Sequence, residues 1–67
     1  MKEFVVKENE GFSLRVKSWK CKSPSNVNAI EFIQESKNKN GEIDMSSVYQ
    51  FFMTDEEIST LTKGLVE

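Results

Sequence analysis

The sequence predicts an α+β fold, a curved four-stranded antiparallel sheet followed by one C-terminal helix packed on it. Two observations lead to this prediction. Four segments of the 67-residue chain alternate apolar and polar residues or are rich in β-branched and aromatic residues, and turn residues separate them. The segment near the C-terminus instead repeats its apolar residues at helical spacing. A chain of this length is expected to form one domain, residues 1–67.

The first two strands are expected at about residues 2–8 and 12–20, with a turn at residues 9–11 between them. In the second segment, FSLRVKSWK, apolar residues alternate with polar and basic ones, so the strand has two different faces. The apolar face carries Phe12, Leu14 and Val16. The opposite face carries Ser13, Arg15, Lys17 and Trp19. One side of this strand therefore suits a core, and the other is basic and aromatic.

The third and fourth strands are expected at about residues 28–36 and 47–53. The third, NAIEFIQES, alternates, and the fourth, SVYQFFM, is aromatic and β-branched. One face of the fourth strand carries Tyr49, Phe51 and Met53, and the other carries Val48, Gln50 and Phe52. Asn40 and Gly41 predict a hairpin turn between the two strands, because both residues tolerate positive φ. Pro24 and its small polar neighbours predict a loop between the second and third strands.

The C-terminal helix is expected over about residues 55–64. Thr54 and Glu57 form a capping box, in which each side chain bonds to the backbone amide of the other. The acidic residues of the first turn also oppose the positive end of the helix dipole. Gly64 is predicted to stop the helix. One apolar stripe at helical spacing consists of Ile58, Leu61 and Leu65.

The segment SKNKNGEIDMSS, residues 36–47, also has the outline of an EF-hand calcium loop, which would place it in an all-helical fold. Gly41 would take the sixth position and Asp44 the ninth. The first and last ligands would be Ser36 and Ser47, where calcium loops have Asp and Glu. The remaining negative charge is too small to hold calcium, so no metal site is predicted.

Composition restricts the chemistry that this chain can perform. It has no histidine and one cysteine, Cys21, so neither an internal disulfide nor a His/Cys metal site can form. No carboxylate or lysine lies beside an obvious nucleophile, and the acidic run at residues 55–57 is explained by helix capping. We therefore expect no enzymatic activity and no cofactor.

Apolar runs in the sequence are too short to span a membrane. The opening residues, MKEFVVKENE, do not resemble a signal peptide, because acidic residues appear almost at once. We expect a cytoplasmic protein of bacterial or phage origin.

The best candidate for a functional surface is SLRVKSWKCK, residues 13–22. The whole chain has a net charge of −2, but residues 1–23 hold six basic residues against three acidic ones. Single-strand binders combine positive charge that follows the phosphates with flat aromatic surfaces on which bases stack. The predicted phosphate-binding residues are Arg15, Lys17, Lys20 and Lys22, and the predicted base-stacking residues are Trp19 and Tyr49. In the alternative interpretation, Trp19 fills the space between sheet and helix, and the lysines keep an edge strand soluble.

Two further segments carry a resemblance to a known family. NGEI is similar to a turn, and QFFMTDEEISTL to a strand that enters the C-terminal helix, in the positive-cofactor-four family of single-stranded-DNA-binding transcriptional coactivators and their bacterial and phage relatives. The resemblance covers residues 12–67 and implies a nucleic-acid-binding sheet and a homodimer in which the helices pack together. Its implied dimer-interface residues are Ile58, Leu61 and Leu65.

The chain departs from that family at one place. The family carries a basic Lys/Arg-Lys-Gly segment just before its last strand, where this sequence has Ser46 and Ser47, with Asp44 nearby. Binding is therefore expected to depend on the second strand and to be weaker.

Two functions remain open on the sequence. In the first, the sheet binds single-stranded DNA or RNA without strong sequence preference, and the protein is an accessory factor in transcription or replication. In the second, a small phage or bacterial protein binds a host protein and inhibits or adapts it, without touching nucleic acid. The small size, the acidic C-terminal half and an exposed sheet edge suit the second function.

Overall fold

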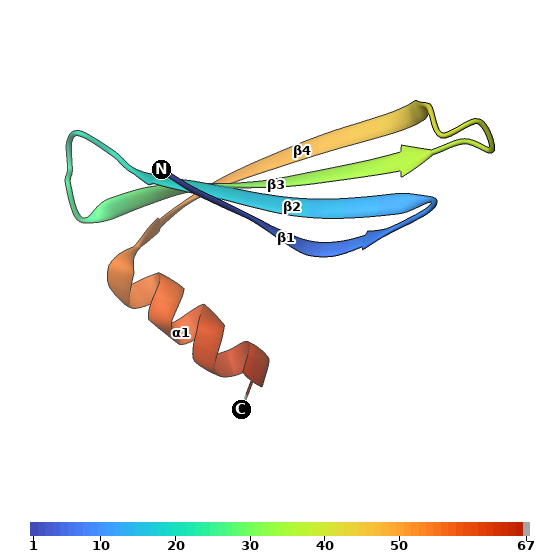
Figure 1. Cartoon of the computed structure of the whole chain (residues 1–67). Helices are drawn as coiled ribbons and strands as arrows, with labels where there is room; N and C mark the ends of the chain where they lie inside the picture. Colours follow the sequence, from blue (N-terminus) through green and yellow to red (C-terminus); the bar gives the residue numbers. More distant parts are fainter. Residues whose placement is uncertain (67) are drawn as a thin grey trace.

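A computed structural model describes residues 1–66 and has the predicted architecture. Four antiparallel strands form one sheet in the order β1-β2-β3-β4, so each strand pairs with the next one in the sequence. The elements are β1 (Lys2–Asn9), β2 (Phe12–Lys20), β3 (Val27–Lys37), β4 (Ile43–Thr54) and α1 (Asp55–Val66). Figure 1 shows the curved sheet with α1 below it, joined to the end of β4.

The turns form where the sequence predicts them. The side chain of Asn9 accepts a hydrogen bond of 3.0 Å from the amide of Gly11 in the β1–β2 turn. In the β3–β4 turn, Gly41 has a φ of 80°, and the side chain of Asn38 accepts a bond of 2.9 Å from the amide of Asn40. Because this turn joins two strands, the EF-hand interpretation, which needs a helix on each side of the loop, is wrong.

Helix α1 begins with the predicted capping box. The amide of Glu57 donates to Thr54 Oγ1 over 3.1 Å, and the amide of Thr54 donates to Glu57 Oε1 over 2.8 Å. The predicted stop at Gly64 is wrong, because this glycine does not adopt positive φ and the helix continues to Val66. In the described chain, no helix has both the length and the apolar character that a membrane span requires.

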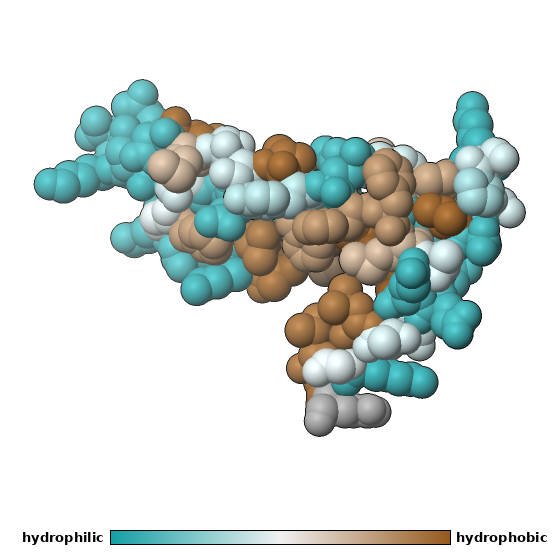
Figure 2. All heavy atoms as spheres, turned by 180° about the vertical axis from the view of Figure 1, so that it is seen from behind, coloured by the Kyte–Doolittle hydropathy of each residue, from teal (hydrophilic) through white to brown (hydrophobic). Residues whose placement is uncertain are grey.

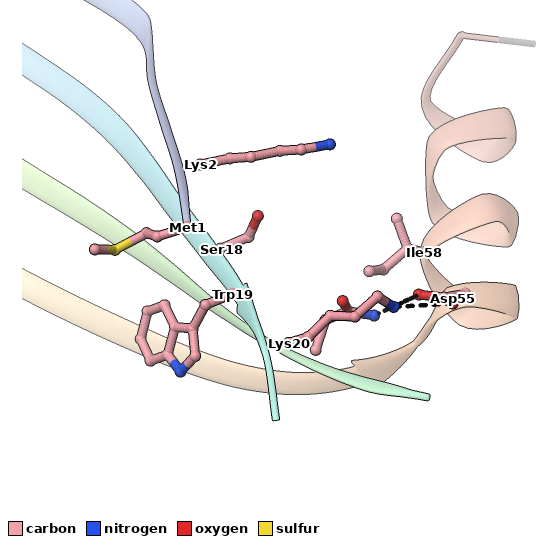
Figure 3. A pocket seen from close by; sticks show the side chains of 8 residues that line it. Met1, Lys2, Ser18, Trp19, Lys20, Asp55 and Ile58 are labelled. Atoms are coloured by element: carbon pink, nitrogen blue, oxygen red, sulfur yellow. Dashed lines mark hydrogen bonds and ion pairs between the residues drawn. The ribbon is translucent and has the colours of Figure 1, made fainter. Parts of the chain in front are cut away.

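Alternation along the strands gives the sheet two faces, which we name by their relation to α1. Ser18 and Lys20 point toward the helix, whereas Trp19 points away from it (Figure 3). On the helix-side face, two neighbouring cross-strand rows are Lys2–Ser18–Ile30–Phe51 and Phe4–Val16–Phe32–Tyr49. On the opposite, open face, three such rows are Val5–Arg15–Ile33–Val48, Glu3–Lys17–Glu31–Gln50 and Trp19–Ala29–Phe52. Both faces follow the alternation that the sequence predicts for β2, β3 and β4.

The core is thin and lies in the two central strands. Within residues 1–66, the buried hydrophobic side chains are Val16, Ala29, Ile30 and Ile33. Helix α1 buries none of its side chains, so it does not pack along the sheet as the sequence analysis expects. Its contacts lie near its first turn, where it follows β4. Because domains are normally built from two packed layers, most of the helix-side face of a single chain lacks its second layer.

Several large apolar side chains of the helix-side face are exposed as a result. Phe4 and Tyr49 are each 54% exposed, and Phe51 is 48% exposed although its ring packs edge-on against Phe32 at 6.0 Å. Figure 2 shows apolar atoms along the lower side of the sheet and on the adjoining part of the helix. These side chains form a contiguous apolar and aromatic patch, whereas exposed apolar residues on an ordinary protein surface are scattered singly.

Candidate functional site

The candidate site is the open face around β2. Arg15, Lys17 and Trp19 project from this face together, because residues two apart on a strand point the same way. Trp19 is half-buried and lies directly opposite Ala29 of β3, a small residue that cannot cover the indole. The sequence prediction that these three side chains share one face agrees with the strand register.

Each cation of this group lies beside a carboxylate. Arg15 Nη1 is 3.8 Å from Glu3 Oε2, and Arg15 Nη2 is 3.4 Å from Glu35 Oε1. Lys17 Nζ is 3.6 Å from the same Glu3 Oε2. Partly exposed pairs of this kind contribute about 0–1 kcal/mol each. A phosphate group can therefore replace a carboxylate at small cost, but the open face attracts phosphate less than its lysine and arginine suggest.

A β-bulge in β1 brings Glu3 to this position. The register shifts between Val5 and Lys7, so that Glu3 pairs with Lys17. If the register set by the pair Asn9–Phe12 continued along β1 without the shift, Phe4 and not Glu3 would lie opposite Lys17. Because a one-residue shift moves every side chain to the other face, the bulge places Glu3 on the open face and Phe4 on the helix-side face.

The other predicted nucleic-acid-binding residues lie elsewhere. Tyr49 pairs with Phe32 on the helix-side face, so it does not stand beside Trp19. Lys20 also points to the helix side, where its Nζ lies 2.9 Å from Asp55 Oδ1 (Figure 3). Lys22 is exposed in the loop between β2 and β3. The structure therefore brings together Arg15, Lys17 and Trp19 and separates them from the remaining candidates.

Asp55 fixes the start of α1 against the sheet. Its Oδ1 accepts a hydrogen bond of 2.7 Å from Asn28 Nδ2 and one of 2.9 Å from Lys20 Nζ. Asn28 Nδ2 also lies within 3.3 Å of the carbonyl oxygen of Met53. The hydrogen bond from Asn28, followed by that from Lys20, holds the pKa of Asp55 below its ordinary value of 3.8. Lys20 therefore serves the junction between sheet and helix.

A shallow hollow lies beside Trp19 on the open face. Its volume is about 390 Å³, and its lining consists of Met1, Lys17, Trp19 and Glu31. Glu31 accepts a long hydrogen bond of 3.4 Å from Gln50 Nε2. Within residues 1–66, Glu31 forms no ion pair. The hollow thus combines an aromatic ring, an ammonium group and a carboxylate without a cationic partner.

Sequence reasoning missed two features of the open face. Phe52 is 63% exposed and lies in the same cross-strand row as Trp19, across Ala29. The alternation within β4 separates Phe52 from the face of Tyr49, and the pairing of Ala29 with both Trp19 and Phe52 assigns Phe52 to the open face. The neutralising glutamates were the second omission. Glu3 reaches its position through the register of β1, which the bulge changes, and Glu35 through the pairing of β3 with β2.

The three predicted dimer residues lie on α1. Ile58 is half-buried and lines a cavity of about 470 Å³ between the helix start and the sheet (Figure 3). Leu61 is 41% exposed and Leu65 is 76% exposed. Their exposure leaves an apolar stripe on the helix available for contact.

The comparisons with known proteins add no relative. No protein-family model, curated protein or solved structure matches this chain. Among residues 1–66, no group of three or more acidic, cysteine or histidine side chains is placed to hold a metal ion.

Proposed function

We propose that this protein binds single-stranded DNA or RNA on the open face of its sheet and acts in the cytoplasm as an accessory factor in transcription or replication. The observation that carries the proposal is the joint position of Arg15, Lys17 and Trp19 on one accessible sheet face. The two cations can contact phosphates, and the indole can stack on a base. The resemblance of the chain to the positive-cofactor-four family supports the same function.

Stacking is expected to supply a large share of the affinity. The attraction of Arg15 and Lys17 for phosphate is reduced by the carboxylates beside them. Lys22, exposed in the loop that follows β2, is a third cation close to Trp19 in the sequence but outside the sheet. Two or three phosphate contacts predict a slope of about −1.4 to −2.1 when log K is plotted against log salt.

Replacement of the indole tests the proposal. Fluorescence anisotropy of a labelled oligo-dT of about eight nucleotides, a typical site size, measures binding. Trp19→Ala is expected to weaken binding roughly 5- to 150-fold, which corresponds to the loss of one stacked base. Tyr49→Ala removes an exposed aromatic ring from the other face and should leave the affinity unchanged. An unmodified protein that binds no oligonucleotide at low salt would refute the proposed function.

We also propose that a second copy of the chain covers the helix-side face. The rings of Phe4, Tyr49 and Phe51 are exposed on the helix-side face, and Leu61 and Leu65 are exposed on α1. Burial of apolar area contributes about 25 cal/mol per Å², so leaving this surface in water is costly. A twofold dimer would give each sheet its missing layer and leave both open faces free for nucleic acid.

The same exposed apolar surface favours the second candidate function, binding of a host protein. In addition, β4 is a long edge strand with one charged residue, Asp44, so little protects its unpaired side against a strand from another protein. This function predicts a chain that stays monomeric at high concentration and has no affinity for oligonucleotides. Sedimentation equilibrium together with the oligo-dT titration distinguishes the two functions.

A further inference from the structure

We propose that the hollow beside Trp19 is a nucleobase pocket that selects guanine, and that Glu31 is the residue that distinguishes this base. The inference rests on the proposed function, because a bound single strand must deliver the base. It goes beyond that function, because phosphate contacts and stacking alone carry little information about sequence.

The arrangement of the hollow suits a base that stacks and hydrogen-bonds at the same time. Lys17 and Glu31 are directly opposite partners in the β2–β3 ladder, so their Cβ atoms lie about 4.5–5.5 Å apart on the open face. Trp19 follows Lys17 by two residues on the same strand and face. A base stacked on the indole can therefore direct one edge toward the Lys17–Glu31 pair.

Both polar groups have capacity for another partner. The bond from Gln50 to Glu31 is 3.4 Å long, near the outer limit for a hydrogen bond, and a carboxylate can accept about four. Lys17 has three N–H donors, and its ion pair with Glu3 at 3.6 Å occupies at most one of them. Neither side chain has to abandon a strong interaction to bind a base.

Guanine is the base whose Watson–Crick edge uses both groups fully. It presents one acceptor, O6, next to two donors, N1–H and N2–H. The carboxylate of Glu31 can accept from both donors at once, and the ammonium group of Lys17 can donate to O6. Cytosine, adenine and thymine each present a single donor group on this edge, so they satisfy one carboxylate oxygen and leave the other without a partner.

The negative charge of Glu31 lowers the affinity for nucleic acid, and a specific contact with a base would offset this loss. A carboxylate in the middle of a face that binds a polyanion repels phosphate and weakens binding of any strand. When guanine fills the hollow, the same carboxylate makes two hydrogen bonds. One group therefore disfavours other bases and favours guanine, which is how specificity commonly arises.

Single-base substitution within a short oligonucleotide tests the pocket. The two probes are about eight thymidines and the same strand with one central dG, which avoids structures that runs of dG form among themselves. The unmodified protein is expected to bind the dG strand at least about fivefold more tightly, since a good bidentate contact discriminates by this factor or more. Anisotropy of labelled strands measures both affinities, and circular dichroism checks that each variant is folded.

Two matched variants isolate the role of Glu31. Glu31→Gln and Glu35→Gln each remove one negative charge from the open face of β3, so both should bind the all-thymidine strand somewhat more tightly. Glu31→Gln should abolish the preference for dG, because the amide replaces one accepting carboxylate oxygen with an NH2 group, which donates and faces a guanine N–H. Glu35→Gln should keep it.

The outcomes separate the pocket from the proposed function. Equal binding of the two strands by the unmodified protein would overturn the guanine pocket and leave single-strand binding in place. Binding of neither strand would overturn both. A preference that survives in Glu31→Gln, or that disappears equally in both variants, would overturn the assignment to Glu31.

Discussion

The two faces of this sheet come from the same four strands but differ in what lies at their centre. The central rows of the helix-side face hold aromatic and aliphatic side chains, and its lysines come from the edge strand β1 and from the end of β2. The open face holds charged side chains at its centre, Arg15 in one row and Glu3, Lys17 and Glu31 in the next. The helix-side face is therefore suited to another protein layer, and the open face to a flexible polar ligand.

The charges of the open face show that a basic strand does not by itself make a basic surface. Residues 13–22 contain several cations and no acid, yet β1 and β3 place Glu3, Glu31 and Glu35 beside them. A face balanced in this way attracts nucleic acid weakly over long distances. The affinity of the open face is expected to come from stacking and specific hydrogen bonds, which form only once the nucleic acid contacts the face.

The largest effect is expected from a charge placed on the apolar stripe of α1. Leu61→Asp should cost little in a single chain, where Leu61 is 41% exposed, but should raise the dimer dissociation constant at least about 30-fold. Sedimentation equilibrium measures the change. Ser59→Asp is the matched control, because residues two apart on a helix do not share a face. If Leu61→Asp dimerises like the unmodified protein, α1 is not part of the interface.

The capping box tests how firmly α1 is attached to the sheet. Thr54→Ala removes the oxygen that accepts the amide of Glu57 and is expected to destabilise the fold by about 1 kcal/mol. Chemical denaturation measures the loss. Thr62→Ala is the control, because the hydroxyl of Thr62 bonds to the carbonyl of Ile58 within the helix and caps nothing. Equal effects of the two changes would show that the cap contributes no specific stabilisation.

Release of the paired cations should raise the affinity of the open face for phosphate. Glu3→Gln removes the carboxylate shared by Arg15 and Lys17 and is expected to raise the affinity for oligo-dT about two- to fivefold at low salt. Glu8→Gln changes the same charge on the same strand and should have a smaller effect. The oligo-dT titration measures both. If the two variants gain equally, the ion pairs of Glu3 do not compete with phosphate.

The smallest expected effect is a dependence on pH at the junction of sheet and helix. Because the pKa of Asp55 is lowered in the folded chain, its stabilising effect is present above the ordinary value of 3.8 and is lost as pH falls through the lower, folded value. Asp55→Asn should therefore be less stable than the unmodified protein at neutral pH, and the difference should shrink below pH 3.8. Thermal unfolding at several pH values measures it. A difference that does not change with pH would contradict this prediction.

Much of the fold could be predicted because each signal acts locally. The alternation of β2 and β4, the turn at Gly41 and the capping box depend on residues close together in the sequence. The end of α1 was missed, because Gly64 tolerates helical φ and nothing nearby forces the chain to leave the helix. Packing of the helix on the sheet was also missed, because it depends on tertiary contacts and not on local pattern.

Only the part of the candidate site that lies on β2 could be predicted from the sequence. The shared face of Arg15, Lys17 and Trp19 follows from strand parity within β2. The carboxylates that surround these residues depend on which residue of a neighbouring strand lies opposite. For Glu3, that pairing changes with the bulge in β1, whose position no turn or spacing in the sequence indicates.

A regular β1, without the bulge, would lie along β2 in another register. β1 is an edge strand with one neighbour, and in that other register residues 1–5 would be shifted by a single position to take up the extra residue, Val6. The shifted register would withdraw Glu3 from Arg15 and Lys17 and bring Phe4 to their side of the sheet. Deleting Val6 would make the present register the regular one and would thereby lock the cations to their acidic neighbour.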